Sequence, residues 1–389
     1  MKILIEQANR RLDVHRLAQH AVQVVDLAAT LQQIAAPTFH EQQRAAYVER
    51  QFQQAGLADI MTDGTYNVYA RMPGRVPRLP ALMITAHTDT VFGPDVELTH
   101  GRDATTLYGP GIGDNCMGVA GMLGAIAVLQ NSAITPDRDL WFVATTCEEG
   151  LGNLRGMRAA FERLKDRIGA VINIEGLAFG HIYHAGIAVK RLHITVRTSG
   201  GHSWLHFGRP SAIHVLMQLG ARIAEVRPPQ QPRTTYNIGL IDGGVSINTI
   251  AASASMWLDL RSEDTTALQA LEREVRQVIR SSETSDAALD IEVVGERPAG
   301  SISPDHPLVR MAVDALETVG IKAILETGST DGNIPLAAGY PAVTVGITRG
   351  GNAHRLDEFA EIGPVEPGMQ QLMTLILAAS HADVVWTTD

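Results

Sequence analysis

Apolar and polar positions alternate with two different periods along the first 175 residues. A spacing of three to four residues predicts a helix over 13–35, and a second helix follows Thr38 and Glu41. A threonine followed three residues later by a glutamate fits a capping box that opens the second helix, and we expect both helices to be structural. Two short strand-like stretches come next, the second over 66–72, and then a mainly apolar strand over 81–86.

The same alternation continues to residue 175. The segment 115–129 is rich in Gly, Ala, Met and Leu at helical spacing and predicts a buried helix directly after Asp114. A strand over 140–146, a helix over 151–164 and a strand over 170–174 follow. Strands and helices in alternation are typical of a layered α/β domain.

The rhythm changes from about residue 189. Two helical patterns now lie among four strand-like patterns, in the order βαββαβ. The six segments are 191–197, 211–225, 235–241, 252–260, 265–281 and 289–294. This order predicts a ferredoxin-like domain, compact enough to be inserted into another domain.

After about residue 297 the α/β pattern returns. Ser303 and Pro304 form a good start for the next helix. The remaining elements are expected over 305–319, near Ala323, after Asp331, over 342–345 and from Pro367. We therefore predict a catalytic domain in two parts, residues 1–187 and 298–389, with a second domain inserted at 188–297.

Composition places the chain among ordinary globular proteins. Its 389 residues exceed one typical domain, and 45% are hydrophobic against 19% charged. A net charge of −10 without a basic cluster argues against a nucleic-acid or anionic-membrane partner. No apolar run approaches the roughly 18 residues of a membrane span, and the first residues lack the apolar block of a signal peptide. Because there are also only two cysteines, we expect a cytoplasmic protein.

Side chains capable of chemistry follow the ends of the predicted strands. His87 and Asp89 end the apolar strand, and residues two apart in a strand point to the same face. A histidine alone is more often part of a core than a metal ligand, but a ligating imidazole usually donates its second N–H to a carboxylate such as Asp89. Asp114 follows glycines in GPGIGDN, where it could approach a metal closely or simply cap the next helix.

Two further strands end in carboxylates. Glu148 and Glu149 follow the strand LWFVATTC, and Glu175 follows AVINI, although each could be an ordinary solvated strand end. Adjacent carboxylates after a buried strand repel one another unless a cation or solvent intervenes. His354, near the C-terminus, adds a second imidazole. Together these residues suit a pair of zinc ions, with one imidazole and one carboxylate for each ion and one carboxylate shared.

The ordered motifs resemble those of a known enzyme family. They are HTDTV, GIGDN, CEEGLGN, NIEG, SGGHSW, GSTDGN and NAHRLDE, spread over nearly the whole chain. The chain is similar to the co-catalytic zinc exopeptidases and deacylases, which include peptidase T, carboxypeptidase G, aminoacylase-1, acetylornithine deacetylase and succinyl-diaminopimelate desuccinylase. The resemblance implies a layered α/β zinc-peptidase domain whose inserted ferredoxin-like domain serves as a lid and in dimerisation.

The resemblance also implies roles for single residues. It implies two Zn²⁺ per chain, with Co²⁺ or Mn²⁺ as possible replacements. The implied ligands are His87 and Glu175 for one ion, Glu149 and His354 for the other, and the bridging Asp114. By the same resemblance Asp89 orients His87, Glu148 is the general base, and the peptide bond between Asp114 and Asn115 is cis.

Further residues belong to the substrate side. By resemblance His202 in SGGHSW reaches the active site of a partner subunit and donates to the oxyanion of the reaction, which implies a homodimer. The alternative is a histidine that caps a glycine turn in its own domain. Asn248 and Arg261 resemble residues that hold a substrate carboxylate, although Arg261 could equally form a surface ion pair. The loop from Gly328 to Asn333 could offer backbone N–H groups to the same end.

The sequence therefore favours a dinuclear zinc hydrolase that cleaves the amide bond of small peptides or N-acyl amino acids, with metal-activated water and Glu148 as the base. A deacetylase or desuccinylase of amino-acid biosynthesis is the alternative within the same chemistry. By resemblance Glu175 leans toward deacylases and carboxypeptidases. A protein of the same fold that binds a metal or small molecule without turnover is a third hypothesis, which the intact base at Glu148 disfavours.

Overall fold

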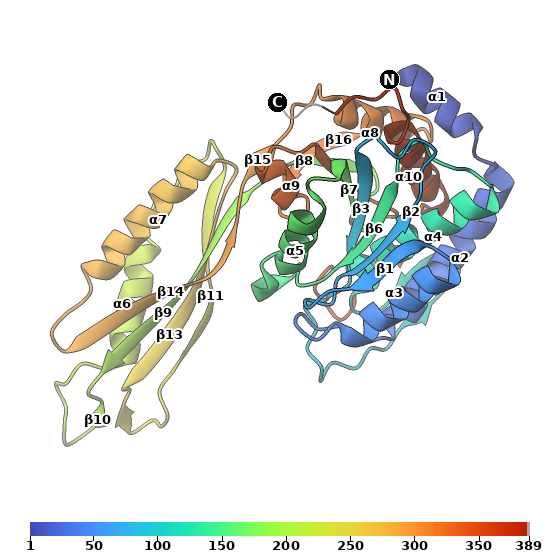
Figure 1. Ribbon diagram of the computed structural model, residues 1–389. Helices are drawn as coiled ribbons and strands as arrows, with labels where there is room; N and C mark the ends of the chain where they lie inside the picture. The colour runs from blue at the N-terminus through green and yellow to red at the C-terminus, as the bar shows by residue number, and fades with distance from the viewer. Residues whose placement is uncertain (387–389) are drawn as a thin grey trace. The chain divides into compact units, whose positions relative to one another are not determined.

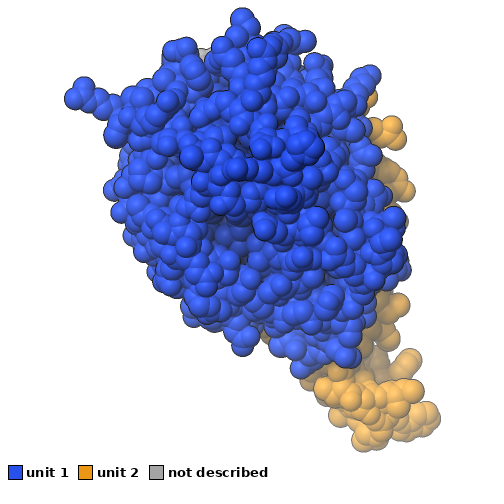
Figure 2. All heavy atoms as spheres, turned by 90° about the vertical axis from the view of Figure 1, so that its right-hand side faces the viewer, with its two compact units in different colours: residues 1–186, 300–389 blue, residues 187–299 orange. Residues whose placement is uncertain are grey.

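The chain folds into two compact units in a computed structural model that describes residues 1–386 (Figure 1). Unit 1 combines Met1–Gly186 with Gly300–Asp389, and unit 2 is Ile187–Ala299. Figure 2 colours unit 1 blue and unit 2 orange. Because unit 2 is a continuous stretch of chain, the sheet of unit 1 is completed by strands from before and after it.

Unit 1 is built on a nine-stranded mixed sheet. The strands run in the order β1-β2-β6-β3-β7-β17-β8-β15, and β16 pairs with β8. Their bounds are β1 (Ala58–Thr62), β2 (Val68–Met72), β3 (Ala81–His87), β6 (Leu140–Thr145), β7 (Ile168–Ile174), β8 (His181–Gly186), β15 (Gly300–Ser301), β16 (Ile324–Gly328) and β17 (Ala342–Val345). Strands β6, β3, β7 and β17 are parallel, so their carboxyl ends meet at one edge of the sheet.

Helices cover both faces of this sheet. Their bounds are α1 (Lys2–Arg10), α2 (Val14–Gln32), α3 (Gln42–Gln54), α4 (Gly118–Asn131), α5 (Arg155–Leu164), α8 (Pro307–Glu317), α9 (Asn333–Ala337) and α10 (Val365–Ala379). Helices α5 and α9 pack on one face, and the other helices pack on the opposite face. Helix α1 was not predicted from the sequence. It is short, and its buried residues Ile5 and Ala8 join the core beside α8 and α10.

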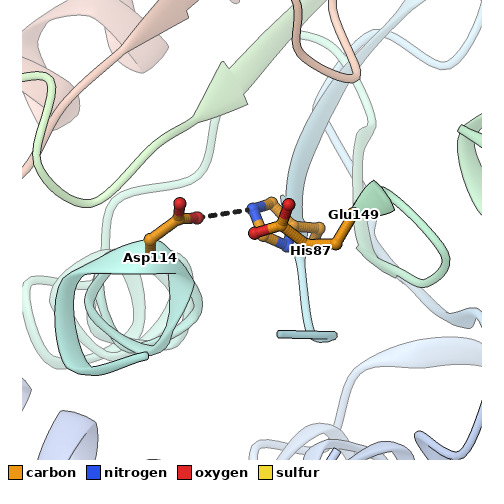
Figure 3. Close-up of side chains that lie close together, drawn as sticks. All are labelled: His87, Asp114 and Glu149. Atoms are coloured by element: carbon orange, nitrogen blue, oxygen red, sulfur yellow. Dashed lines mark hydrogen bonds and ion pairs between the residues drawn. The ribbon is translucent and has the colours of Figure 1, made fainter. Parts of the chain in front are cut away.

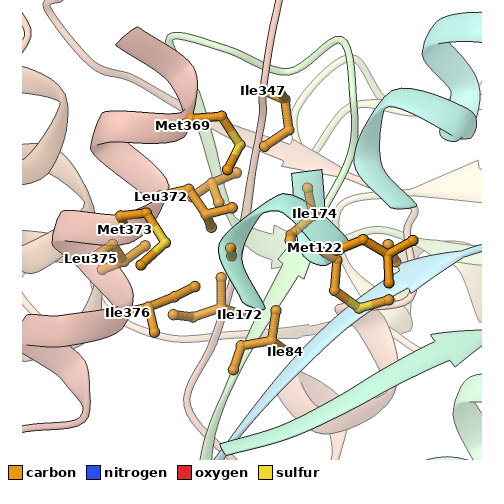
Figure 4. Packing of buried hydrophobic residues seen from close by; sticks show 14 of the residues in the cluster. Ile84, Met122, Ile172, Ile174, Ile347, Met369, Leu372, Met373, Leu375 and Ile376 are labelled. Atoms are coloured by element: carbon orange, nitrogen blue, oxygen red, sulfur yellow. The ribbon is translucent and has the colours of Figure 1, made fainter. Parts of the chain in front are cut away.

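The central strands send alternate side chains into two apolar cores. Leu82 and Ile84 of β3 pack into the larger core, whereas Ala81 and Met83 pack into the smaller one. Figure 4 shows the larger core, where side chains of β3, β7, α4 and α10 gather in one apolar layer. Each such side chain contributes about 1.5–3 kcal/mol by its burial. His87 ends β3 in register with the residues that face the smaller core, because side chains alternate along a strand.

The helical segment Ile112–Asn131 corrects one expectation. By length and mean hydropathy, 1.6, it could cross a membrane, although the sequence analysis found no such run. In the structure 89% of its apolar window is buried inside unit 1. The segment therefore forms the central helix of the larger core, which explains why it is apolar on all sides.

Several helices start at residues other than those predicted: α4 begins at Gly118 and not at 115, and α5 begins at Arg155 and not at 151. Helix α3 begins at Gln42 without a side-chain cap. Helix α8 begins at Pro307, because the ring of His306 accepts the N–H of Leu308 and takes the capping position expected at Ser303. Helix α10 begins two residues before Pro367.

A small four-stranded sheet, not foreseen from the sequence, brings two distant segments of unit 1 together. Its order is β18-β19-β5-β4. The bounds are β4 (Gly101–Arg102), β5 (Thr106–Tyr108), β18 (Gly350–Gly351) and β19 (Phe359–Glu361). Because β19 pairs with β5, the hairpin that contains His354 lies beside the segment that leads to Asp114.

Unit 2 has the predicted βαββαβ order. Its four-stranded antiparallel sheet runs β11-β13-β9-β14, which is the ferredoxin-like arrangement. The elements are β9 (Ala188–Thr198), β10 (Gly201–His202), α6 (Ala212–Ile223), β11 (Thr234–Gly243), β12 (Thr249–Ile250), β13 (Ser253–Ser262), α7 (Thr265–Arg280) and β14 (Ala287–Arg297). Helices α6 and α7 pack together on the sheet and close a separate apolar core. The α/β fold class with an inserted ferredoxin-like domain is confirmed.

Candidate metal centre

His87 is the last residue of β3 and is almost fully buried. Its Nδ1 atom lies 3.1 Å from the backbone oxygen of Asp89 and 3.5 Å from Oδ1 of the same residue. Its Nε2 atom lies 3.1 Å from Oδ1 of Asp114 and 3.4 Å from Oε2 of Glu175. One ring nitrogen is therefore held by Asp89 while the other faces two carboxylates, which is how a ligating histidine is usually supported.

Asp114 lies in a π-helical turn, Ile112–Met117, that precedes α4. Its φ and ψ angles, −109° and 89°, are not helical, and α4 begins only at Gly118. Asp114 therefore does not cap the next helix, which was its alternative role. The peptide bond to Asn115 is cis, as the resemblance implied.

The side chain of Asn115 joins this turn to the end of β7. Its amide nitrogen donates to the backbone oxygen of Ile174 at 2.8 Å. Its amide oxygen accepts the N–H of Gly176, also at 2.8 Å. The two peptide groups flank Glu175, so Asn115 fixes the position of Glu175 relative to Asp114.

His354 reaches the centre on the hairpin between β18 and β19. Its Nε2 atom lies 3.1 Å from Oδ2 of Asp114 and 3.2 Å from Oε1 of Glu149. The two imidazoles thus face different oxygens of one carboxylate, His87 on Oδ1 and His354 on Oδ2 of Asp114. The Asp114 carboxylate therefore lies between the two imidazoles.

Asp89 holds the strand end that carries Glu148 and Glu149. The N–H of Glu148 donates to Oδ1 of Asp89 at 3.0 Å, and the N–H of Glu149 donates to Oδ2 at 2.9 Å. Both glutamates and Asp89 are buried. The Asp89 carboxylate therefore supports both the His87 ring and the backbone of Glu148 and Glu149.

Figure 3 shows His87, Asp114 and Glu149 converging from β3, the turn before α4 and the loop after β6. Ligand atoms of these three residues lie within 4.8 Å of one another. Imidazole nitrogens and carboxylate oxygens are ligands that zinc takes, and divalent cations would balance the excess of buried carboxylates. The residues of the centre therefore fit a pair of divalent cations.

In the metal-free protein, bound protons offset part of the negative charge of the centre. Burial raises the pKa of Glu149 to about 7 and also raises that of Glu175. Hydrogen bonds to Asp114 and Glu149 raise the pKa of His354 to about 10. Burial disfavours a charged His87, but the carboxylates of Glu175 and Asp114 outweigh it and raise the pKa of His87 well above its usual value. Metal binding must displace these protons.

Metal affinity is accordingly expected to rise with pH. Between pH 6 and pH 9 the apparent affinity should increase about tenfold per pH unit for each proton released, because Glu149 titrates near pH 7 and His354 higher. Calorimetric titration of the metal-free protein with Zn²⁺, in two buffers of different ionisation enthalpy, counts the released protons. An affinity that stays constant over this range would contradict the prediction that His354 is a ligand.

Thr38 and Glu41 do not form the predicted capping box. The Thr38 hydroxyl donates to Oδ2 of Asp89 at 2.9 Å, and Glu41 accepts the N–H of Cys147 at 3.0 Å. Both contacts come from elements far away in the sequence, so no local pattern could indicate them. Thr38 and Glu41 support the strand end that leads to Glu148.

Two further buried carboxylates lie beside the centre, and sequence patterns did not distinguish them. Glu358 accepts three backbone N–H groups from the turn that carries Asp114. Asp331 accepts the Thr145 hydroxyl at 2.6 Å, and burial together with the charge of Glu148 raises its pKa to about 8. Both lie in motifs noted above, NAHRLDE and GSTDGN, which was the only signal available.

Three of the predicted residues belong to unit 2. His202 is in β10, and the next residue, Ser203, donates its N–H to the backbone oxygen of Asn248 at 3.0 Å. His202 and Asn248 are therefore neighbours. Arg261 donates through Nε to Asp259 at 2.5 Å, which is the ion pair considered as its alternative role.

Gly328 ends β16 in unit 1. A Cβ atom at this position would lie 2.6 Å from the ring of Tyr183, so a larger residue does not fit without movement. In the loop that follows, the N–H groups of Thr330 and Gly332 donate to side chains of the same loop. These two N–H groups are therefore already engaged.

Comparison with known families assigns the chain. The sequence model of peptidase family M20/M25/M40 matches residues 83–378, which is more than half of the chain. The chain belongs to this family. The matched region contains all five predicted metal ligands of this M20/M25/M40 protein.

One named relative and two solved structures are also similar to this M20/M25/M40 protein. A probable carboxypeptidase of Emericella nidulans is 24% identical over 267 residues, covering 62% of this chain and 61% of that protein, so the chain spans less than two thirds of the relative. A tripeptidase of Staphylococcus aureus is 21% identical with a TM-score of 0.77, over 92% of this chain and 98% of that one. A Bacillus subtilis protein described as a dinuclear metal binding peptidase is 16% identical with a TM-score of 0.66, over 93% and 99%. The structural likenesses show the shared fold.

Proposed function

We propose that this protein is a metal-dependent hydrolase that cleaves the amide bond of small peptides or N-acyl amino acids. The observation that carries the proposal is the position of His87 and His354, each 3.1 Å from a different oxygen of the Asp114 carboxylate. Such a pair of imidazoles on one carboxylate suits two adjacent cations with a shared ligand. Membership of a peptidase family supports the same reaction class.

Five side chains would hold the two cations. They are His87 and Glu175 for one cation, Glu149 and His354 for the other, and Asp114 for both. We propose zinc, with cobalt or manganese as substitutes, since nitrogen and oxygen ligands suit all three metals. When bound, the two cations lower the pKa of water and polarise the scissile carbonyl. The description of the Bacillus subtilis relative as a dinuclear metal binding peptidase supports this pairing.

Glu148 is the general base in this proposal. Its backbone N–H donates to Asp89, which fixes the backbone at this residue. The carboxylate of the next residue, Glu149, faces His354. Adjacent side chains diverge along an extended backbone, so one glutamate can face a cation while the other faces the substrate. Glu148 accepts the proton of the attacking water and passes it to the leaving amine.

We also propose that a second copy of the chain completes the site with His202. The N–H groups of Trp204 and Leu205 lie 3.2 and 3.5 Å from Nδ1 of His202 and donate to it. Nδ1 is therefore an acceptor, so the ring hydrogen is on Nε2, where it can be donated outward. His202 itself is exposed.

Strand β11 suits the contact between two copies. It pairs with β13 on one side and lies at the edge of the unit 2 sheet, where the outer side of a strand can pair with the same strand of another molecule. Leu240 and Ile241 on β11, with Val245 just beyond it, expose most of their apolar surface. Association would cover these side chains.

Hydrolysis of a substrate panel tests the proposed function. The panel combines dipeptides, tripeptides, N-acetyl amino acids and N-succinyl amino acids, each with protein loaded with Zn²⁺, Co²⁺ or Mn²⁺. We expect release of a free amine from the peptides, because the relatives named above are peptidases, and loss of activity after chelation. Release from N-acyl amino acids alone would assign a deacylase instead. Two bound metals without hydrolysis of any compound would leave a binding protein.

A further inference from the structure

The carboxylate of Glu358 is buried beneath the turn that carries Asp114. Its Oε1 atom accepts the N–H groups of Gly113 and Asp114, both at 2.8 Å. Its Oε2 atom accepts the N–H of Gly111 at 3.1 Å. Glu358 has no exposed surface, and each of its oxygens is used by this one turn. Three backbone N–H groups directed at one carboxylate form an anion-binding nest.

The backbone of the turn is shaped so that these N–H groups converge. Gly111 has a φ angle of 75°, which favours glycine. A Cβ atom at Gly113 would lie 2.4 Å from the side chain of Leu177, which would have to move to make room. The glycines of the GPGIGDN motif therefore allow the turn to close around Glu358 and place Asp114 at its end.

Glu358 also belongs to the segment that carries a second candidate ligand. It follows His354 by four residues, and its backbone oxygen accepts the N–H of Gly109 at 2.9 Å. Its backbone N–H donates to the oxygen of Arg355, within the same hairpin. The segment with His354 and the turn with Asp114 are thus joined through one residue, by both its backbone and its side chain.

We propose that Glu358 is a positioning residue that holds Asp114 between the two cations and so couples the binding of one cation to that of the other. The inference rests on the proposed function, because it concerns the same pair of cations. Movement of the turn would withdraw Asp114 from His87 and His354 together, since Asp114 faces both. Replacing a residue that orients ligands in this way changes metal affinity by roughly 10–100-fold.

The test compares Glu358→Gln with the wild-type protein. Glutamine has one acceptor oxygen, so its NH₂ group must face at least one of the three N–H donors. We expect Zn²⁺ affinity, measured by calorimetry and by competition with a chromophoric chelator, to fall about 10–100-fold for both ions together. The d–d spectrum of the Co²⁺-loaded protein should change as well. Excess metal should restore most of the turnover, because Glu358 does not contact the substrate in this scheme.

Two companion variants keep the result interpretable. Glu361→Gln makes the same chemical change three residues away, at an exposed position on β19, and should leave affinity and spectrum unchanged. Glu358→Asp keeps the charge but shortens the side chain by one methylene, so it should weaken metal binding even if the glutamine variant does not fold. Thermal unfolding of each metal-free variant separates loss of stability from loss of affinity.

Different failures have different signatures. If Glu358→Gln and Glu358→Asp melt at lower temperature yet bind both metals as the wild type does, Glu358 is only structural and the inference is wrong. If the wild-type protein itself does not bind two metals, the proposed function fails before the variants are considered. If the variants lose one metal and keep the other with unchanged affinity, the coupling through Asp114 is overturned.

Discussion

Replacing Glu148 with glutamine is expected to lower kcat by about 10²–10⁴-fold while the protein still binds two metal ions. Glutamine keeps the size of the side chain but cannot accept the proton of the attacking water. The backbone hydrogen bond from residue 148 to Asp89 is unaffected by the change, so the strand end should stay in place. The measurement combines steady-state kinetics with metal analysis of the same preparation.

Glu149→Gln provides the matched control, because the same substitution is made at the next residue. Its carboxylate lies 3.2 Å from His354 and is proposed to hold a cation, so this variant should lose metal as well as turnover. A Glu148 variant that loses its metal in the same way would make Glu148 a ligand. A Glu148 variant with unchanged kcat would remove it from the reaction altogether.

Mixing two inactive variants should restore activity if His202 acts across a dimer. His202→Ala alone is expected to lower kcat by about 10²–10³-fold, because a donor to the oxyanion is worth roughly 3 kcal/mol. In a mixed dimer with Glu148→Gln, one site keeps Glu148 from one chain and His202 from the other. After free exchange about half of the dimers are mixed and have one intact site, so roughly a quarter of the sites should be active.

The control for this experiment mixes Glu148→Gln with Glu149→Gln. Both defects then lie in unit 1, and no combination of chains makes an intact site, so activity should not return. Failure of the His202 mixture to recover, with exchange of subunits shown independently, would place His202 in its own chain or outside the reaction. The metal content of the His202 variant should equal that of the wild-type protein throughout.

The sheet of unit 1 was the most predictable part of the fold. The run at 81–86 is apolar except for Thr85, and the structure buries it between two cores, with Leu82 on one side and Met83 on the other. A strand of this kind must be central, and parallel central strands carry their carboxyl ends to one edge. That is why His87, Glu148 and Glu175, at or just after the ends of three such strands, could be grouped from the sequence. The βαββαβ order of the insert was equally predictable, since it depends on the local periodicity of apolar residues.

Local patterns failed where the decisive contact was long-range. Thr38 and Glu41 have the spacing of a capping box, but Asp89 and the N–H of Cys147 offered partners from across the sheet. Asp114 looked equally suited to capping a helix, but the chain turns before the helix starts. In each case the side chain could form hydrogen bonds either with the start of a nearby helix or with groups far away in the sequence. Only the fold determines which of these groups is close enough.

Hydrophobic periodicity and motif order were enough to predict the family, the layered α/β class with its ferredoxin-like insert, and a short set of ionisable residues at strand ends. These follow from hydrophobic period and motif order, which are properties of neighbouring residues. The folded structure was needed to show that His87 and His354 face different oxygens of Asp114, and that Glu358 lies under the turn that carries Asp114. The distance between residues more than two hundred positions apart depends on how strands pair and turns close, and no local pattern encodes it.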